Sequence, residues 1–174
     1  MTPREAVAKA CREAGERQVA LWCAELIMEP DWEHPVLKWI GGASLAAYRE
    51  RDLTNEVNEY WLRVWGARAL LYAWAPQAAP AVVAGLDDPA WRVREMCGKV
   101  ARLRELGEAA EPLARLTTDE TVRVRLVAVK ALAVVGEGEH AAALHDACHD
   151  PDMTVRDAAR SAVYTLGRRL ERPL

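Results

Sequence analysis

The sequence predicts an all-α, right-handed α-solenoid, which is a stack of helical pairs. Two observations support this prediction: a short motif returns every 31 residues, and apolar residues follow each copy at the spacing of one helix face. Of the 174 residues, 51% are hydrophobic and 28% are charged, so the chain has enough apolar side chains for a packed core. No apolar run reaches the roughly 18–20 residues that span a bilayer, and we expect no membrane partner.

The first 56 residues do not follow the 31-residue period, and we expect them to pack as a cap on the stack. Apolar residues at helical spacing predict one helix after Thr2 and a second after Gly15. The segment 29–42, which contains Pro and Trp, then departs from a plain solenoid. Two interpretations stay open, because such an insertion either closes the exposed end of the stack or forms a functional loop.

Four repeats follow, and the last is truncated. Their bounds are 57–87, 88–118, 119–149 and 150–174. Asp before Pro, as at Asp88 and Asp150, places a carboxylate at a helix N-cap and the proline ring at the first helical position. The predicted first helices of the repeats span about 89–105, 120–135 and 151–167, and the predicted second helices span about 109–117 and 140–148. The first helices are expected to end at three glycines, Gly107, Gly138 and Gly167. One such pair cannot bury its own apolar face, so we expect the pairs to stack into one structural domain.

This pattern resembles the HEAT-like repeats, in the short form found in phycocyanobilin-lyase-type proteins. The matching residues are Asp88, Pro89, Val93 and Arg94; Asp119, Val124, Arg125, Ala128, Ala131, Leu132 and Gly136; and Asp150, Pro151, Val155, Arg156, Ala159, Ala162, Leu166 and Gly167. The resemblance covers 57–174 and implies the fold. It implies little about function, because this family is mainly a scaffold.

One arginine recurs in each repeat, directly after a Val in three repeats and after Leu62 in the first. A row of guanidinium groups suits a polyanion, but the same arginines are also placed to pair with the Asp of a neighbouring repeat. The pairing is favoured because both partners recur with the same period. We therefore predict a structural Asp–Arg ladder, made of Asp88, Arg94, Asp119, Arg125, Asp150 and Arg156.

The chain contains no nucleophile–base motif, phosphate loop or dinucleotide fingerprint, so we predict no catalytic residue and no cofactor and do not expect an enzyme. The predicted function is a non-enzymatic protein–protein interaction scaffold. Two alternatives stay open: nucleic-acid binding related to the HEAT-like DNA glycosylases, and a small-molecule or lyase-type role in a Trp-lined pocket. A net charge of −3 gives no electrostatic reason to expect nucleic acid.

The predicted partner surface combines the second helices with the segment 29–42. Matching positions in successive repeats form a column, and a column whose residues differ in chemistry is not required for packing between repeats. Three such columns fall on one helical face. The predicted contact residues are Glu111, Arg115, Asp146 and His149, with Trp32 and Trp39 as aromatic anchors. The expected partner is a protein or peptide of unknown identity.

Cysteine and histidine usage completes the predictions. The four cysteines form no CxxC pair, which favours free thiols in a reducing cytoplasm, and the Arg-rich, Lys-poor composition is typical of a GC-rich bacterial genome. His145 and His149 lie four residues apart, a spacing that can place two imidazoles on one metal, with His140 nearby. Solvated histidines are the favoured interpretation, and we predict no metal.

Overall fold

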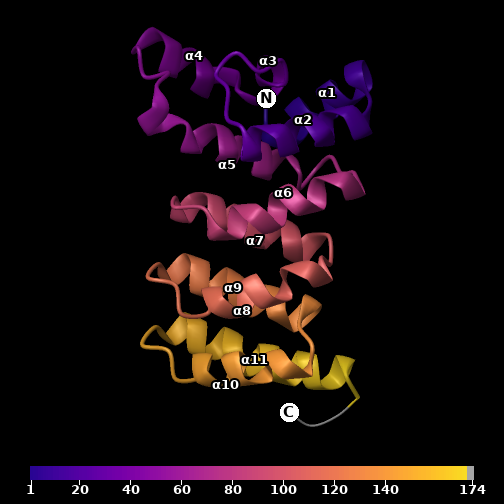
Figure 1. The fold of residues 1–174 in the computed structure, drawn as a ribbon, viewed down its shortest axis with the longest axis vertical. Helices are drawn as coiled ribbons and strands as arrows, with labels where there is room; N and C mark the ends of the chain where they lie inside the picture. The colour runs from indigo at the N-terminus through magenta and orange to yellow at the C-terminus, as the bar shows by residue number, and fades with distance from the viewer. Residues whose placement is uncertain (172–174) are drawn as a thin grey trace. The chain divides into compact units, whose positions relative to one another are not determined.

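The structure is a computed structural model that describes residues 1–171 (Figure 1). The described part of the chain is built from helices and contains no strand, so the predicted all-α solenoid class is confirmed. The chain divides into a first unit, Met1–Gly85, and a second unit, Leu86–Leu174. The single structural domain stays a prediction. Within residues 1–171, no helix has the length and hydropathy that crossing a bilayer requires.

The first unit begins with the two helices that the sequence predicts. Its helices are α1 (Pro3–Ala14), α2 (Glu16–Met28), α3 (Leu37–Ile40), α4 (Gly42–Glu50), α5 (Tyr60–Ala69) and α6 (Ala79–Ala84). A capping box starts α1, because the Thr2 hydroxyl accepts the N–H of Glu5 and the Glu5 carboxylate accepts the N–H of Thr2. Gly15 joins α1 to α2 with a φ of +84°, a conformation that a side chain would strain.

Trp32 lies in an aromatic cluster inside the first unit. Its ring stacks on Tyr48 with centroids 5.6 Å apart and meets Trp65 edge-on at 6.2 Å. Its indole N–H donates to the carbonyl oxygen of Asn55 at 3.4 Å. With both its apolar surface and its one donor engaged inside the unit, the side chain is only 8% exposed.

Trp39 is buried in the same way and to the same extent. Its ring stacks on Trp22 at 6.0 Å, and its indole N–H donates to the Glu13 carboxylate at 3.1 Å. In a chain without Phe, these tryptophans fill the core of the first unit. Their role as anchors for a partner stays a prediction.

Helices α2 and α5 approach each other closely at Gly66. Both helices belong to the first unit and pack along their lengths. A β carbon built on Gly66 would lie 2.6 Å from the carbonyl oxygen of Cys23, which is closer than real β carbons approach. The missing side chain is therefore what allows this helix pair to pack at its observed distance.

The second unit contains the helical pairs predicted for the repeats. Its helices are α7 (Trp91–Leu103), α8 (Ala110–Leu116), α9 (Val122–Val135), α10 (Ala141–Ala147) and α11 (Met153–Arg169), and single 3-10 turns precede α8 and α10. The long helix α9 packs against both α7 and α11 (Figure 1). The predicted inward residues are buried: Val93, Cys97, Val100, Leu113, Val124, Ala128, Ala131, Val135, Leu144, Val155, Ala159, Ala162 and Leu166.

The long helices of the second unit begin two residues later than the sequence predicts. The aspartates do not cap them, because the Oδ1 atoms of Asp88 and Asp150 accept the N–H two residues further along and close a turn. In α11 the capping side chain is instead Asp152. The predicted end at Gly167 is also wrong, since α11 continues through this residue to Arg169.

Candidate functional site

The Asp–Arg ladder connects successive helical pairs of the second unit. The Arg94 guanidinium holds both carboxylate oxygens of Asp119, with Nε at 2.8 Å and Nη2 at 3.2 Å. One repeat further on, Arg125 holds Asp150 in the same way, at 2.7 Å and 3.1 Å. The two carboxylate side chains are only 6% and 5% exposed. These are the pairs that the 31-residue period predicts, in the bidentate geometry that makes Arg–carboxylate contacts strong.

The ladder pair shifts the ionisation of both its members. The hydrogen bond from Arg125 is the main cause that holds the pKa of Asp150 below its usual range, and the same bond raises the pKa of Arg125. Because the pKa of Asp150 is lower in the folded than in the unfolded chain, the ionised carboxylate favours folding.

We expect acid to destabilise the protein partly through Asp150. Its contribution is fully present above the unfolded pKa of about 3.9 and is lost as the pH falls through the lower folded pKa. Urea unfolding between pH 6 and pH 2.5 measures this, and Asp150→Asn should show a shallower loss on acidification than the wild type. Asp157→Asn, on the exposed side of α11, is the control and should keep the wild-type slope. Equal slopes for Asp150→Asn and the wild type would contradict the assignment.

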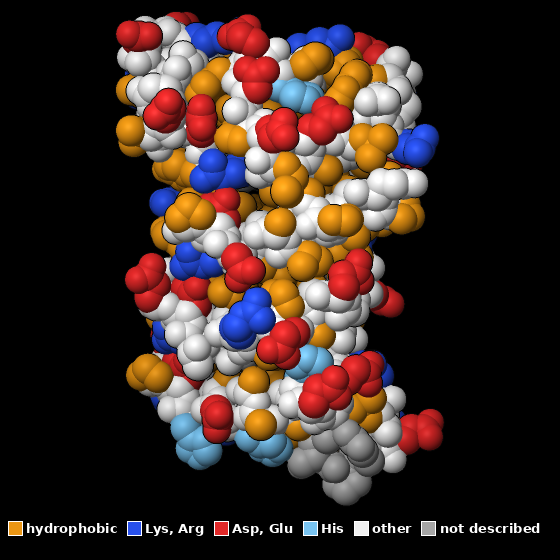
Figure 2. Space-filling view, viewed as in Figure 1, with side chains coloured by type: hydrophobic (Ala, Val, Ile, Leu, Met, Phe, Trp, Pro, Cys, Tyr) orange, Lys and Arg blue, Asp and Glu red, His pale blue; other side chains and the backbone are white. Residues whose placement is uncertain are grey.

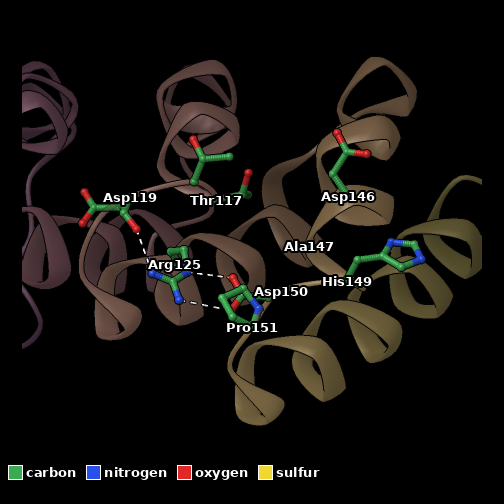
Figure 3. A pocket seen from close by; sticks show the side chains of 9 residues that line it. Thr117, Asp119, Arg125, Asp146, Ala147, His149, Asp150 and Pro151 are labelled. Atoms are coloured by element: carbon green, nitrogen blue, oxygen red, sulfur yellow. Dashed lines mark hydrogen bonds and ion pairs between the residues drawn. The ribbon is translucent and has the colours of Figure 1, made fainter.

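A cavity of about 380 Å³ opens beside the second ladder pair. Thr117 and Thr118, at the end of α8, form one part of its lining, and Asp146 and His149, at the end of α10, form another. Arg125 contributes the ladder side, where Figure 3 shows it reaching Asp150 and the backbone of Asp119. The cavity therefore lies where two second helices end next to a completed Asp–Arg pair.

The polar groups of this cavity that remain open are hydrogen-bond acceptors. Arg125 makes four hydrogen bonds, two to Asp150 and two to backbone carbonyls. Thr117 and Thr118 each donate their hydroxyl hydrogen to a carbonyl of α8, so only their lone pairs remain. The cavity thus has few donors to offer a ligand.

Asp146 and His149 add two more acceptors. Within residues 1–171, the exposed Asp146 carboxylate makes no hydrogen bond or ion pair. His149 Nδ1 lies 3.2 Å from the carbonyl oxygen of His145, which can only accept, so this nitrogen carries a proton, and in the uncharged form of the ring Nε2 is an acceptor. Asp119 and Asp150 are each neutralised by an arginine, which leaves Asp146 as the unpaired charge of the lining.

The structure brings together only part of the predicted partner surface. Asp146 and His149 line the cavity, whereas Glu111 and Arg115 lie elsewhere on α8. Arg115 is flanked by two acidic side chains, Asp87 at 3.6 Å and Glu111 at 3.7 Å. On the face shown in Figure 2, acidic side chains are scattered over the second unit and Lys and Arg form no continuous patch. The surroundings therefore do not favour an anionic ligand.

Sequence reasoning missed Thr117 and Thr118 as lining residues. Thr118 does fall in one of the variable columns, opposite Asp87 and His149, and this position was the available signal. Thr117 is at the position equivalent to Leu86 in the preceding repeat, and a leucine there predicts a buried packing residue. The side chain is indeed buried, and it lines the cavity while its hydroxyl donates to the carbonyl oxygen of Ala114 at 2.8 Å.

The described residues contain no group of three or more His, Cys, Asp or Glu side chains arranged to hold a metal ion. His140, one member of the histidine cluster, is buried, and its Nδ1 accepts the backbone N–H of Glu137 at 2.9 Å, which starts the turn before α10. We therefore derive no metal-dependent step from these residues.

Comparison with solved structures finds a match to human deoxyhypusine hydroxylase in complex with glycerol. The TM-score is 0.57 at 20% sequence identity, and the match covers 90% of this chain and 67% of the hydroxylase chain. No family model and no curated protein sequence matches the chain. At this identity the likeness shows a shared all-helical fold and nothing finer.

The match contradicts the predicted function. The scaffold prediction depended on the view that this repeat fold is mainly non-enzymatic, and the matched protein is an enzyme. The alternatives fit no better, because the matched protein is neither a DNA glycosylase nor a lyase. The conclusion from these comparisons is that the chain shares its fold with a hydroxylase.

Proposed function

We propose that the chain binds an amine-bearing side chain of a polypeptide in the cavity between the ends of α8 and α10. The observation that carries the proposal is the cavity's one-sided chemistry: its open polar groups are acceptors, and its unpaired charge is the Asp146 carboxylate. A protonated amine supplies three donors and one positive charge, which is the complement of such a lining. A carboxylate or phosphate would meet unpaired negative charge and few donors.

The contacts expected for an ammonium group follow from the lining. The Asp146 carboxylate forms a charge-assisted hydrogen bond with it, and the hydroxyl oxygens of Thr117 and Thr118 accept its other N–H groups. The volume of about 380 Å³ accommodates a long aliphatic side chain. The solved hydroxylase with this fold is named for acting on deoxyhypusine, an amine-bearing amino acid, which supports testing this class of ligand first.

We also propose a repeat family for the helical pairs and a cellular compartment for the protein. We infer that the helical pairs are short HEAT-like repeats, supported by the 31-residue period and by ladder pairs that recur with it. Four free cysteines, two of them buried, support a reducing cytoplasm as the compartment.

A titration monitored by NMR tests the proposed amine site. The probes are the peptide Gly-Gly-Lys-Gly-Gly with blocked ends, the same peptide with an acetylated lysine, and deoxyhypusine. The two amines should give saturable shifts of the backbone amides of Thr117, Thr118 and His149, because Asp146 binds their positive charge. The peptide with acetylated lysine lacks this charge and should give no saturable shift. Asp146→Asn should weaken lysine-peptide binding about five- to tenfold.

Asp157→Asn is the matched control, because this exposed aspartate on α11 lies outside the cavity. It should bind like the wild type. Equal binding of the acetylated peptide, or unchanged affinity in Asp146→Asn, would show that the cavity does not recognise amines.

A further inference from the structure

Arg156 repeats the geometry of the ladder arginines at the last motif of the chain. In Arg94 and Arg125, Nη1 donates to the two carbonyls that precede the helix, which leaves Nε and Nη2 directed at the next aspartate. Arg156 makes the same two bonds, from Nη1 to the carbonyls of Asp150 at 2.7 Å and Pro151 at 2.9 Å. Its guanidinium is therefore held in the orientation that binds a carboxylate in the two preceding repeats.

No carboxylate from residues 1–171 binds the guanidinium of Arg156. Within residues 1–171, neither Nε nor Nη2 of Arg156 makes a hydrogen bond or ion pair. The nearby acids are engaged, because Asp152 accepts the N–H groups that start α11 and Asp157 pairs with Arg160 at 3.1 Å. Two parallel donors are thus pre-oriented and available, on a side chain that is half-buried.

We propose that Arg156 is a docking point for the carboxylate of an aspartate on a partner polypeptide. The internal copies define the occupant: an aspartate that opens a helix-start turn, with one oxygen accepting the backbone N–H two residues further along and both oxygens on the arginine. The planar guanidinium matches a planar carboxylate with two parallel bonds. The partner is therefore a segment of the type Asp-x-x that begins a helix, and Arg156 itself is not among the residues that line the proposed amine cavity.

The test follows the side-chain Nε–H signals of the full chain by NMR. The probe is a blocked peptide with the sequence of residues 150–156, Asp-Pro-Asp-Met-Thr-Val-Arg, compared with the same peptide carrying Asn at its first position. The Asp peptide should move the Arg156 Nε–H signal saturably, and the Asn peptide should bind about tenfold more weakly. The signals of Arg94 and Arg125 should not move, because their carboxylates are already bound.

The variant Arg156→Lys identifies the Nε–H signal of Arg156 by its disappearance. It also tests the two-donor geometry, because lysine keeps the charge but loses the two parallel donors. This variant should abolish saturable binding, whereas Arg160→Lys, the neighbouring control, should bind normally. Inorganic phosphate at matched ionic strength is the third probe. Equal binding of the Asp and Asn peptides, a response to phosphate alone, or unchanged binding in Arg156→Lys would each overturn the proposal.

Discussion

Replacing Arg125 with alanine is expected to lower the free energy of unfolding by about 3–5 kcal/mol. The change leaves the Asp150 carboxylate, which is only 5% exposed, without its cation, and it removes the donor of two backbone carbonyls. Urea unfolding followed by circular dichroism measures the effect as a lower transition midpoint. The loss should appear at neutral pH, where Asp150 is ionised and its charge is uncompensated.

Arg160→Ala is the matched control for this prediction. Its partner Asp157 is as exposed as Arg160 itself, at more than 60% each, and removal of such a pair changes stability by less than about 1 kcal/mol. The double variant Arg125→Met/Asp150→Leu should recover most of the lost stability, because two apolar side chains leave no buried charge. An Arg125→Ala midpoint equal to that of Arg160→Ala would show that the ladder pair contributes nothing.

Replacing Gly66 with alanine is expected to cost about 1–3 kcal/mol. The added β carbon would lie 2.6 Å from the backbone carbonyl oxygen of Cys23, and a backbone atom cannot rotate away as a side chain does. Helices α2 and α5 must therefore move apart, and the resulting loss of packing outweighs the gain of about 1 kcal/mol in helix propensity. The transition midpoint in urea measures the net effect.

Gly107→Ala is the control for Gly66→Ala. A β carbon at Gly107 meets no atom within 4 Å, so this variant should have wild-type stability or a slight gain. If Gly66→Ala were as stable as Gly107→Ala, the close approach of α2 to α5 would not limit the packing of the first unit.

The repeat architecture was predictable from the sequence because it depends on local patterns that recur. Val93, Val124 and Val155 are buried as the periodic apolar stripe requires, and Leu113 and Leu144 point inward. The helix starts were not predictable to the residue, since an aspartate followed by proline can cap a helix or close a turn. Here the turn is formed, because both oxygens of Asp119 and Asp150 also face an arginine of the preceding repeat.

The candidate site was predictable only in part. Asp146 and His149 emerged from repeat positions with variable chemistry, and both line the cavity. The burial of Trp32 and Trp39 was not predictable, because composition does not distinguish an exposed indole from one whose N–H finds a partner inside the unit. The cavity itself arises from where α8 and α10 end in space, which no local pattern encodes.

Each ladder aspartate serves two repeats at once. Asp119 closes the turn that starts its own long helix and also binds the arginine of the repeat before it, and Asp150 does the same one repeat later. The turn of one repeat is therefore fully satisfied only when its neighbour is folded. In a stack where repeats contact only their neighbours, such sharing raises the nearest-neighbour coupling relative to the intrinsic stability of a repeat. The consequence is cooperative folding of the second unit, in which partly unfolded arrays are rare.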